Sequence, residues 1–259
     1  MVLVVGGVPT RRNDMKKIMS AVTAALTLMA GNVLASGGNW GYTGKAAPEH
    51  WGSLDPAYAL CASGDNQSPI DLTNFTEAKL EPIRFNYTGL VTEVAHTGHA
   101  IQANYTAGST IKVNGNIFTL KQINFHAPSE HLVNGGQVPV EAHFIHTDNK
   151  GSFAIIAVLY TLGNEHPELK KIWQQMPAKV GIKAGMTSQV RADNLMPGNK
   201  DYYRVNGSLT TPPCTEGVLW MIMKNPVPVG EKQIKKLVQV LKHPNNRLVQ
   251  PINARLVLQ

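Results

Sequence analysis

One Asn-Gly pair between two alternating segments constrains the fold of this 259-residue chain more than any other feature. Residues 110–113 and 117–120 alternate apolar and polar side chains on either side of Asn114 and Gly115. This pair accepts the positive backbone φ angles that a two-residue hairpin turn requires. Because the alternation continues through residues 121–126, the sequence predicts an antiparallel hairpin with a long second strand.

Two further segments are predicted to be strands. Residues 140–146 alternate, and residues 154–160 form a continuous apolar run, which is typical of a central strand covered on both faces. Sixteen prolines and twenty-three glycines indicate many turns, which favours a β-rich architecture. No internal repeat or linker is visible after residue 36, so residues 36–259 are predicted to form one domain.

Two segments have the i, i+3, i+4, i+7 spacing of apolar residues that indicates an amphipathic helix. Both are predicted to lie on the surface and to pack on a sheet. The predicted fold class is therefore mainly β (α+β), with a large, twisted, mostly antiparallel central sheet and short peripheral helices. The apolar residues are Leu169, Ile172, Trp173 and Met176 in the first segment and Ile234, Leu237, Val238 and Leu241 in the second.

The first 35 residues are predicted to be an upstream extension and a signal peptide that is removed. Lys16 and Lys17 supply a positive start, residues 21–30 supply a short apolar run, and Ala35 fits a small-residue cleavage site. The apolar run is too short for a transmembrane helix. The mature protein is therefore expected to be periplasmic or secreted, without a membrane span.

The charge of the mature chain argues against nucleic acid as a partner. Residues 1–35 hold four basic residues and one acidic residue, so their removal lowers the formal charge from +7 to about +4. The remaining lysines and arginines are scattered, with no basic run longer than a pair such as Lys170-Lys171. A nucleic-acid-binding protein would carry a basic patch or stripe.

The mature chain contains two cysteines, Cys61 and Cys214. An even number of cysteines in an exported protein favours a disulfide, because the compartments outside the cytoplasm are oxidising. Two buried free thiols are the alternative. The disulfide is the preferred prediction, and it would close a very long loop.

Two of the predicted strands carry polar residues at positions that suit a metal site. Residues i and i+2 of a strand point to the same face, so Asn124 and His126 point together, as do Glu141 and His143. If the two strands are neighbours, two imidazoles and one carboxamide meet at one point. Histidine is the usual zinc ligand, and a catalytic zinc keeps three protein ligands and one open position. The pattern therefore indicates a Zn²⁺ site.

Eight short segments carry a family resemblance. The longest are QINFHAPSEH at 122–131, EAHFIH at 141–146 and SLTTPPCTEGVLW at 208–220. The shorter ones are WGY at 40–42, QSPI at 67–70, TGH at 97–99, NNR at 245–247 and QP at 250–251. In these segments, and in their order along the chain, the protein resembles the bacterial, exported alpha-class carbonic anhydrases.

The resemblance implies reversible hydration of carbon dioxide to bicarbonate and a proton by a zinc-bound hydroxide. His126 and His143 would bind the metal, and Asn124 stands where the family has a third histidine. An asparagine amide oxygen is a neutral and poorly basic ligand compared with imidazole, so the zinc affinity is expected to fall. Gln122 and Glu141 would orient the residues at positions 124 and 143.

The same resemblance assigns roles to residues around the metal. Thr210 would orient the hydroxide and pair with Glu130, while His99 would carry the proton to solvent. Without the resemblance, His99 would be interpreted as a solvated loop residue and the apolar residues as ordinary core. The resemblance implies a CO2 pocket of Ile145, Ile155, Leu209, Trp220 and Thr211, and a proton path whose waters are held by Tyr42, Thr97 and Gln102.

Asn124 leaves a second hypothesis open: a catalytically silent, carbonic-anhydrase-like binding protein that keeps the fold and has lost the metal. Retention of the other site residues favours the enzyme. A metalloprotease is excluded because no His-Glu-x-x-His is present, and a serine hydrolase because no Gly-x-Ser-x-Gly is present. The expected small-molecule partner is CO2 or bicarbonate, and the chain is expected to be a monomer or a homodimer.

The remaining histidines receive structural interpretations. His50, His166 and His243 lie near turns and are expected to be exposed. His131 and His146 are expected to support the site or the core.

Overall fold

The predicted hairpin is present in the computed structural model of the chain. Strand β5 (Thr110–Val113) pairs antiparallel with strand β6 (Asn116–His126). The turn residues Asn114 and Gly115 have φ angles of 47° and 80°, as a two-residue hairpin turn requires. The long second strand is confirmed as well, since β6 extends over 11 residues.

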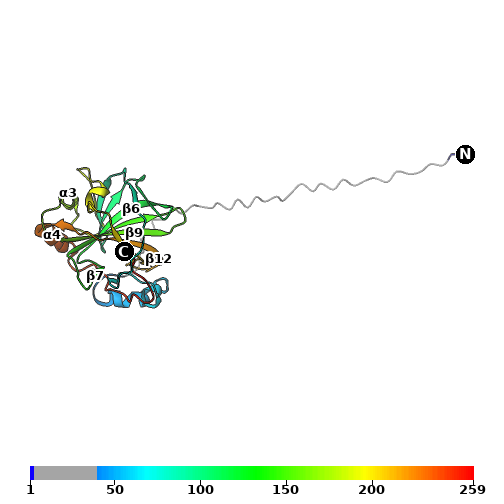
Figure 1. Cartoon of the computed structure of the whole chain (residues 1–259). Helices are drawn as coiled ribbons and strands as arrows, with labels where there is room; N and C mark the ends of the chain where they lie inside the picture. The colour runs from blue at the N-terminus through cyan, green and yellow to red at the C-terminus, as the bar shows by residue number, and fades with distance from the viewer. Residues whose placement is uncertain (3–39) are drawn as a thin grey trace. The chain divides into compact units, whose positions relative to one another are not determined.

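The structure describes residues 1–2 and 40–259 (Figure 1). Residues 40–259 belong to one unit, Gly37–Gln259. Except for its first two residues, the predicted extension and signal peptide of residues 1–35 lie outside the described part of the chain. None of the helices in that part is long and apolar enough to cross a lipid bilayer.

Most strands of the described residues join one large sheet. The strands are β1 (Asp71–Leu72), β2 (Arg84–Asn86), β3 (Val91–His96), β4 (Ile101–Tyr105), β5, β6, β7 (Leu132–Val133), β8 (Val140–Thr147), β9 (Phe153–Leu162), β10 (Lys183–Gly185), β11 (Tyr202–Ser208), β12 (Glu216–Met223) and β13 (Val227–Val229). The 11-stranded sheet has the order β10-β3-β4-β6-β8-β9-β12-β11, with β5 on β6, β2 on β5 and β13 on β9. β12 and β13 run parallel to β9 and the other pairs are antiparallel, so the mostly antiparallel sheet is confirmed. β1 and β7 form a separate parallel pair.

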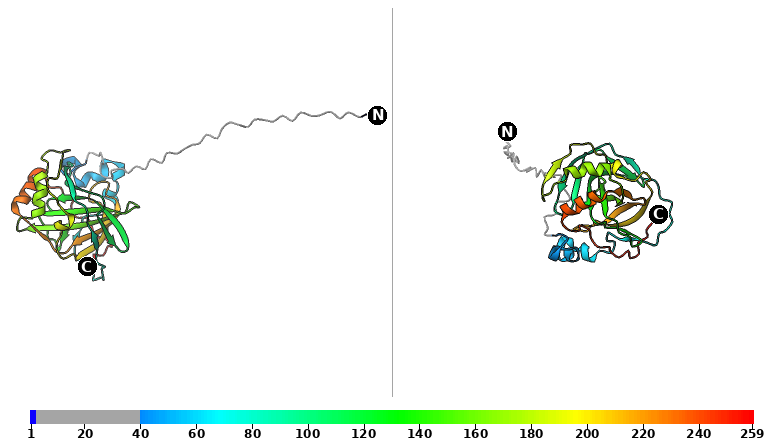
Figure 2. Two further views of the ribbon diagram at one scale, coloured as in Figure 1. Left: turned by 90° about the horizontal axis from the view of Figure 1, so that it is seen from above. Right: turned by 90° about the vertical axis from the view of Figure 1, so that its left-hand side faces the viewer.

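Two helices cover one face of the sheet, α3 (Pro167–Gln175) and α4 (Glu231–Leu241), as predicted. They lie next to each other in Figures 1 and 2, and the Trp173 indole N–H of α3 donates to the Gln233 carbonyl of α4 at 3.0 Å. The expected packing of Val238 is wrong, because this side chain is 46% exposed. The other helices of the described residues are short: α1 (Trp51–Leu54), α2 (Leu60–Ser63) and the 3-10 helices η1 (Gly44–Ala46), η2 (Pro48–His50), η3 (Pro56–Tyr58) and η4 (Ala192–Leu195).

Strand alternation places the apolar side chains of the sheet in two clusters, one on each face. On β8, Ala142 and Phe144 belong to the cluster that also contains the buried residues of α3 and α4. Ile145, the next residue, belongs to a second cluster with Ile155 of β9 and Trp220 of β12. The polar residues of the predicted metal site alternate in the same way. They therefore lie on the face opposite to the two helices.

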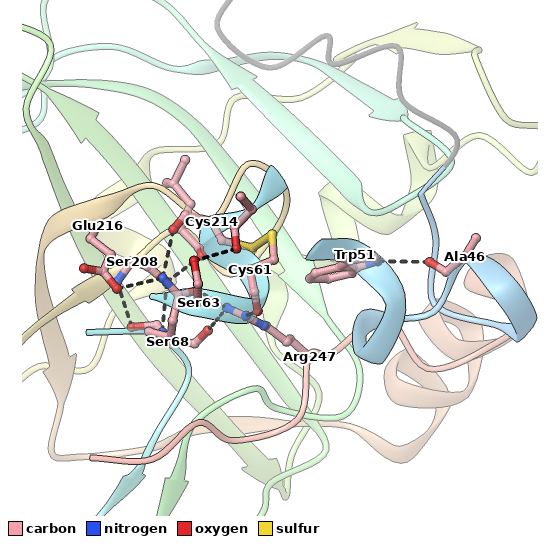
Figure 3. The surroundings of a disulfide bond; sticks show 12 residues. Ala46, Trp51, Cys61, Ser63, Ser68, Ser208, Cys214, Glu216 and Arg247 are labelled. Atoms are coloured by element: carbon pink, nitrogen blue, oxygen red, sulfur yellow. Dashed lines mark hydrogen bonds between the residues drawn. A yellow bond between two sulfur atoms is a disulfide. The ribbon is translucent and has the colours of Figure 1, made fainter. Parts of the chain in front are cut away.

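A disulfide joins the N-terminal segment to the loop between β11 and β12. Cys61 and Cys214 are bonded across 153 residues of sequence, so the predicted disulfide is confirmed and the free thiols are ruled out. Figure 3 shows this bond beside Arg247, whose guanidinium donates to the Cys61 carbonyl oxygen at 2.8 Å. The disulfide thus holds the start of the described fold against the loop that contains Thr210.

Candidate metal site

The predicted metal site is built on two neighbouring antiparallel strands. In the register of β6 and β8, Asn124 lies opposite His143 and His126 lies opposite Glu141. The rings of His126 and His143 are 4.5 Å apart, measured between centroids, and both are buried. Strand periodicity correctly placed each pair of residues on one face, and the pairing of β6 with β8 brings the two pairs together.

Each of the two imidazoles has one nitrogen fixed by a hydrogen bond. Nδ1–H of His126 donates to the Asn245 carbonyl oxygen at 2.8 Å. Nε2–H of His143 donates to Oε1 of Glu141, also at 2.8 Å. A neutral imidazole protonated at one nitrogen carries a lone pair on the other. His126 Nε2 and His143 Nδ1 are consequently the two nitrogens free to bind a metal.

Glu141 is the buried anion that holds this arrangement. Besides His143, its carboxylate accepts from Nδ1–H of His131 at 2.7 Å and from the backbone N–H groups of Glu130 and His131 at 2.8 Å. Burial alone would raise the pKa of Glu141, but the charges of His131 and His143 and their hydrogen bonds hold it well below its ordinary value. The carboxylate therefore remains ionised and orients two histidines at once.

His143 is kept in the neutral form that metal binding requires. Its pKa is lowered, first by burial and then by the charge of His126, against the opposing effect of Glu141. A second carboxylate, Glu130, lies nearby with its Oε2 atom 3.7 Å from Nδ1 of both His126 and His143. That Oε2 atom is buried and has no hydrogen-bond partner among the described residues, so the expected contact with Thr210 is not made to it. The other carboxylate oxygen accepts from the Arg247 backbone N–H at 2.8 Å.

Asn124, the third residue of the predicted metal site, is held less rigidly than the two histidines. Its side chain is half-buried, and Oδ1 accepts from Gln122 Nε2 at 3.2 Å. An amide oxygen has two lone pairs, so this contact leaves one of them for a cation. Two fixed imidazoles, an amide oxygen and an unpaired buried carboxylate oxygen are a donor set that suits a divalent metal such as zinc.

Thr210 lies in the loop after β11, next to Leu209, which belongs to the same apolar cluster as Ile145 and Trp220. The Leu209 backbone N–H donates to the Thr215 carbonyl at 2.9 Å, which closes the loop, and Thr210 is buried. Ser208 anchors the start of the loop by accepting from the Ser68 backbone N–H at 2.9 Å. Thr211, the residue after Thr210, is half-buried. The four apolar residues predicted to line the CO2 pocket belong to one cluster: Ile145, Ile155, Leu209 and Trp220.

His99 lies at an aromatic cluster rather than free in a loop. Its ring stacks on Trp40 with centroids 3.7 Å apart and an interplanar angle of 12°. Tyr42 also contacts Trp40, at 5.8 Å between centroids, and its hydroxyl is buried. Of the other predicted proton-path residues, Thr97 uses its hydroxyl within its own turn, and Gln102 donates to Asn104 Oδ1 at 2.6 Å.

Two supporting residues were not assigned roles from the sequence. Asn245 orients His126 through its backbone carbonyl, and its side chain also accepts from the Ala127 backbone N–H at 2.8 Å. Arg247 is buried and donates to Gln67, Ser68 and Cys61. Burial lowers the pKa of Arg247 to about 10, while the charge of Glu130 acts in the opposite direction. The motif around residues 245–247 was the available signal, but a backbone carbonyl has no signature in a sequence.

The remaining histidines differ in part from expectation. His50 is exposed, as predicted, but His166 is only 7% exposed because its Nδ1 accepts from the Leu169 N–H at the start of α3. His243 is half-buried rather than exposed. His131 supports Glu141, and His146 is buried against the Tyr87 hydroxyl at 2.8 Å.

Known proteins resemble the chain over nearly all of the described unit. Residues 46–259 match the model of the eukaryotic-type carbonic anhydrase family. A carbonic anhydrase of Neisseria gonorrhoeae is 39% identical over 252 residues, which cover 97% of this chain and all of that protein. The structure is similar to the alpha-carbonic anhydrase of Thermovibrio ammonificans in complex with sulfanilamide, with a TM-score of 0.85, 45% identity and coverage of 86% of this chain and 100% of that one. It is also similar to dioscorin complexed with ascorbate, at a TM-score of 0.79, 29% identity and coverage of 85% and 96%.

The family match and the bacterial relative agree with the geometry of the paired histidines. The chain belongs to the eukaryotic-type, or alpha-class, carbonic anhydrase family.

Proposed function

We propose that this chain catalyses the reversible hydration of carbon dioxide to bicarbonate and a proton, with zinc as its cofactor. The observation that carries the proposal is the pair His126 and His143. Their rings are 4.5 Å apart on adjacent strands, and each has its second nitrogen held by a hydrogen bond of 2.8 Å. Such preorganisation is what a catalytic metal site requires.

His126, His143 and Asn124 would hold the zinc, leaving a fourth position open. When bound, zinc supplies hydroxide at neutral pH by lowering the pKa of a coordinated water to about 7. Glu141 and Gln122 orient the residues at positions 143 and 124 through the hydrogen bonds described above.

The chain's own residues then position the reactants. With zinc bound, the Thr210 hydroxyl would accept a hydrogen bond from the nucleophile and would turn its own proton toward Oε2 of Glu130, which has no hydrogen-bond partner among the described residues. Carbon dioxide is small and apolar, so the apolar side chains beside His143 suit it. The Trp220 ring lies 4.8 Å from the His143 ring, and Ile145 and Leu209 share its cluster.

One proton must leave the site for each CO2 that is hydrated. His99 is the proposed group for this step, because an imidazole can both accept and release a proton and this ring lies at the aromatic cluster beside Tyr42. Water molecules near Tyr42, Thr97, Gln102 and Thr211 would connect the site to His99.

The mature protein is proposed to function outside the cytoplasm, in the periplasm or after secretion. The Cys61–Cys214 disulfide supports this location, because such bonds persist in oxidising compartments. A monomer or a homodimer is the proposed assembly.

Asn124 supports a second candidate function, a binding protein of the same fold without catalysis. Dioscorin complexed with ascorbate is a structural relative of this chain. A silent protein would lack bound zinc.

Stopped-flow measurement of CO2 hydration, combined with zinc analysis, separates the two functions. The purified protein should contain about one zinc per chain, accelerate hydration, and lose both zinc and activity on dialysis against a chelator. His143→Ala serves as the inactive control, and Asn124→His restores the ligand set of the family. A zinc-free, inactive parent that gains zinc and activity in Asn124→His would contradict the enzyme and support the binding protein.

A further inference from the structure

Two histidines, not one, lie at the aromatic cluster that adjoins the candidate site. The cluster consists of Trp40, Tyr42, Trp51, His99 and His243. Tyr42 contacts both Trp51 and His243, with centroid separations of 5.7 Å and 6.1 Å. Because His99 stacks on Trp40 in the same cluster, the two imidazoles belong to one group of packed rings. They reach it from distant parts of the sequence.

His99 is held in place with one ring nitrogen unsatisfied. Its backbone carbonyl accepts from Asn245 Nδ2 at 3.0 Å, and its ring is fixed by the stack on Trp40. Nδ1 of this ring is buried and has no hydrogen-bond partner within the described part of the chain. An unsatisfied buried polar atom points to a catalytic role or to an ordered water.

Tyr42 presents a second unsatisfied atom in the same cluster. Its hydroxyl oxygen is buried and has no hydrogen-bond partner among residues 40–259. Burial, followed by the negative charge of Glu130, raises the pKa of Tyr42 well above its ordinary value. Tyr42 therefore stays a neutral phenol, which can hold a water between the site and the histidines but cannot take up the proton itself.

His243 has the geometry of a proton acceptor with access to solvent. Its Nδ1–H donates to the Pro244 carbonyl at 2.9 Å, which leaves the lone pair on Nε2. The side chain is half-buried, between the cluster and water. It follows Lys242, the C-cap of α4, whose φ angle of 68° ends the helix just before His243.

We propose that His243 is a second proton-transfer residue, which receives the proton from His99 and releases it to solvent. The inference rests on the proposed function, because CO2 hydration is the source of the proton. For each turnover His99 gains one proton at a ring nitrogen and loses it, directly or through water, to Nε2 of His243. His243 then gives that proton to water or buffer, so both rings return to the neutral state.

The electrostatics of the pair favour passing a proton on rather than storing two. The pKa of His99 is lowered first by burial and then by the charge of His243. A proton on one ring therefore disfavours a proton on the other. Tyr42 and Lys242 are the other titratable groups in contact with His243 or adjacent to it in sequence, and Glu130 acts on the cluster through Tyr42.

The test compares His243→Gln with the parent and with His50→Gln, a control at an exposed histidine outside the cluster. In dilute buffer the maximal hydration rate of His243→Gln should fall about 3- to 10-fold. This loss is smaller than the ~10²–10⁴-fold that a proton-transfer group typically contributes, because His99 can still release its proton directly to water. Concentrated imidazole buffer should restore the rate. Isotope exchange between CO2 and bicarbonate at equilibrium needs no net proton release and should not change.

A titration of His99 by NMR supplies a readout that does not depend on turnover. The pKa of His99 should rise in His243→Gln and stay constant in His50→Gln. An unchanged rate in dilute buffer, or an unchanged His99 pKa, would overturn the relay while leaving the proposed function intact. Absence of CO2–bicarbonate exchange in the parent would instead overturn the proposed function, and the relay with it.

Discussion

The two sides of the candidate metal site are built with different rigidity. On one side, His126 and His143 are buried and each donates a 2.8 Å hydrogen bond to a fixed acceptor. On the other, Asn124 is half-buried and accepts a longer hydrogen bond, of 3.2 Å, from Gln122 Nε2. The candidate site therefore has firm support at His126 and His143 and weaker support at Asn124.

The two sides are expected to determine different properties of the site, namely the position of a bound metal and the affinity for it. We propose that the two anchored histidines set the position of a bound metal, because their free nitrogens are fixed by the protein, and that Asn124 sets how tightly the metal is held. The following variants test that division, beginning with the largest expected effect.

Removal of an anchored ligand should have the largest effect. His143→Ala should lower the zinc affinity more than about 100-fold, because losing an anchored imidazole costs more than the ~10–100-fold lost with a ligand's hydrogen-bond partner. Asn124→Ala should lower it less than about tenfold, because a neutral amide oxygen is a weak zinc ligand that water can replace. Competition with a fluorescent chelator measures both affinities. Equal losses of zinc affinity in the two variants would show that His143 and Asn124 contribute equally to metal binding.

Restoring the family ligand should strengthen the weaker side of the site. Asn124→His should raise the zinc affinity about 10–100-fold, since imidazole is the better zinc ligand and the site is otherwise assembled. The same chelator competition applies, with Asn104→His on the neighbouring strand β4 as the matched control. An affinity that stays constant in Asn124→His would mean that position 124 does not face the metal.

The residues that hold His143 and Asn124 in place should differ in the same direction in their effect on zinc affinity. Glu141→Gln should reduce the zinc affinity about 10–100-fold, because Glu141 holds two histidine rings and two backbone N–H groups. Gln122→Ala should reduce it less than about tenfold, since its contact is longer and only partly buried. Circular dichroism controls for unfolding in each variant. A larger loss of zinc affinity in Gln122→Ala than in Glu141→Gln would contradict the conclusion that the side of Asn124 is the less rigid one.

A structural histidine on the same strand sharpens the contrast with the ligands. Burial lowers the pKa of His146 from 6.5 to about 3, so the folded state resists protonation that the unfolded state accepts. The stability from this neutral histidine is fully present above pH 6.5 and is lost as the pH falls toward 3, by about 1.4 kcal/mol per pH unit. His146→Gln should flatten that part of the pH dependence without changing the zinc affinity at pH 8. Urea unfolding at pH 7, 6, 5 and 4 provides the check.

Much of the fold followed from local patterns in the sequence. The Asn114-Gly115 turn and the alternation along residues 117–126 and 140–146 predicted β6 and β8, because strand periodicity also determines which side chains share a face. The sequence could not say that β6 and β8 are neighbours. That pairing depends on the order of strands in the whole sheet.

The errors and omissions arose where long-range contacts decide the outcome. His166 is buried where its side chain caps α3 and its backbone N–H and carbonyl are bonded to the side chain of Gln233, which lies 67 residues away in the sequence. Val238 is exposed because α4 buries a narrower stripe than its apolar spacing suggested. The support of His126 comes from a backbone carbonyl, which any residue at position 245 would supply.

A crystal structure of the zinc-loaded protein, with anomalous data at the zinc edge, tests the metal site most directly. We predict one ion at about 2.0–2.1 Å from His126 Nε2 and His143 Nδ1, and at about 2.0–2.2 Å from Asn124 Oδ1. A site without zinc under saturating metal would contradict the proposed chemistry. An ion held by Glu130 in place of Asn124 would contradict the assignment of the third ligand.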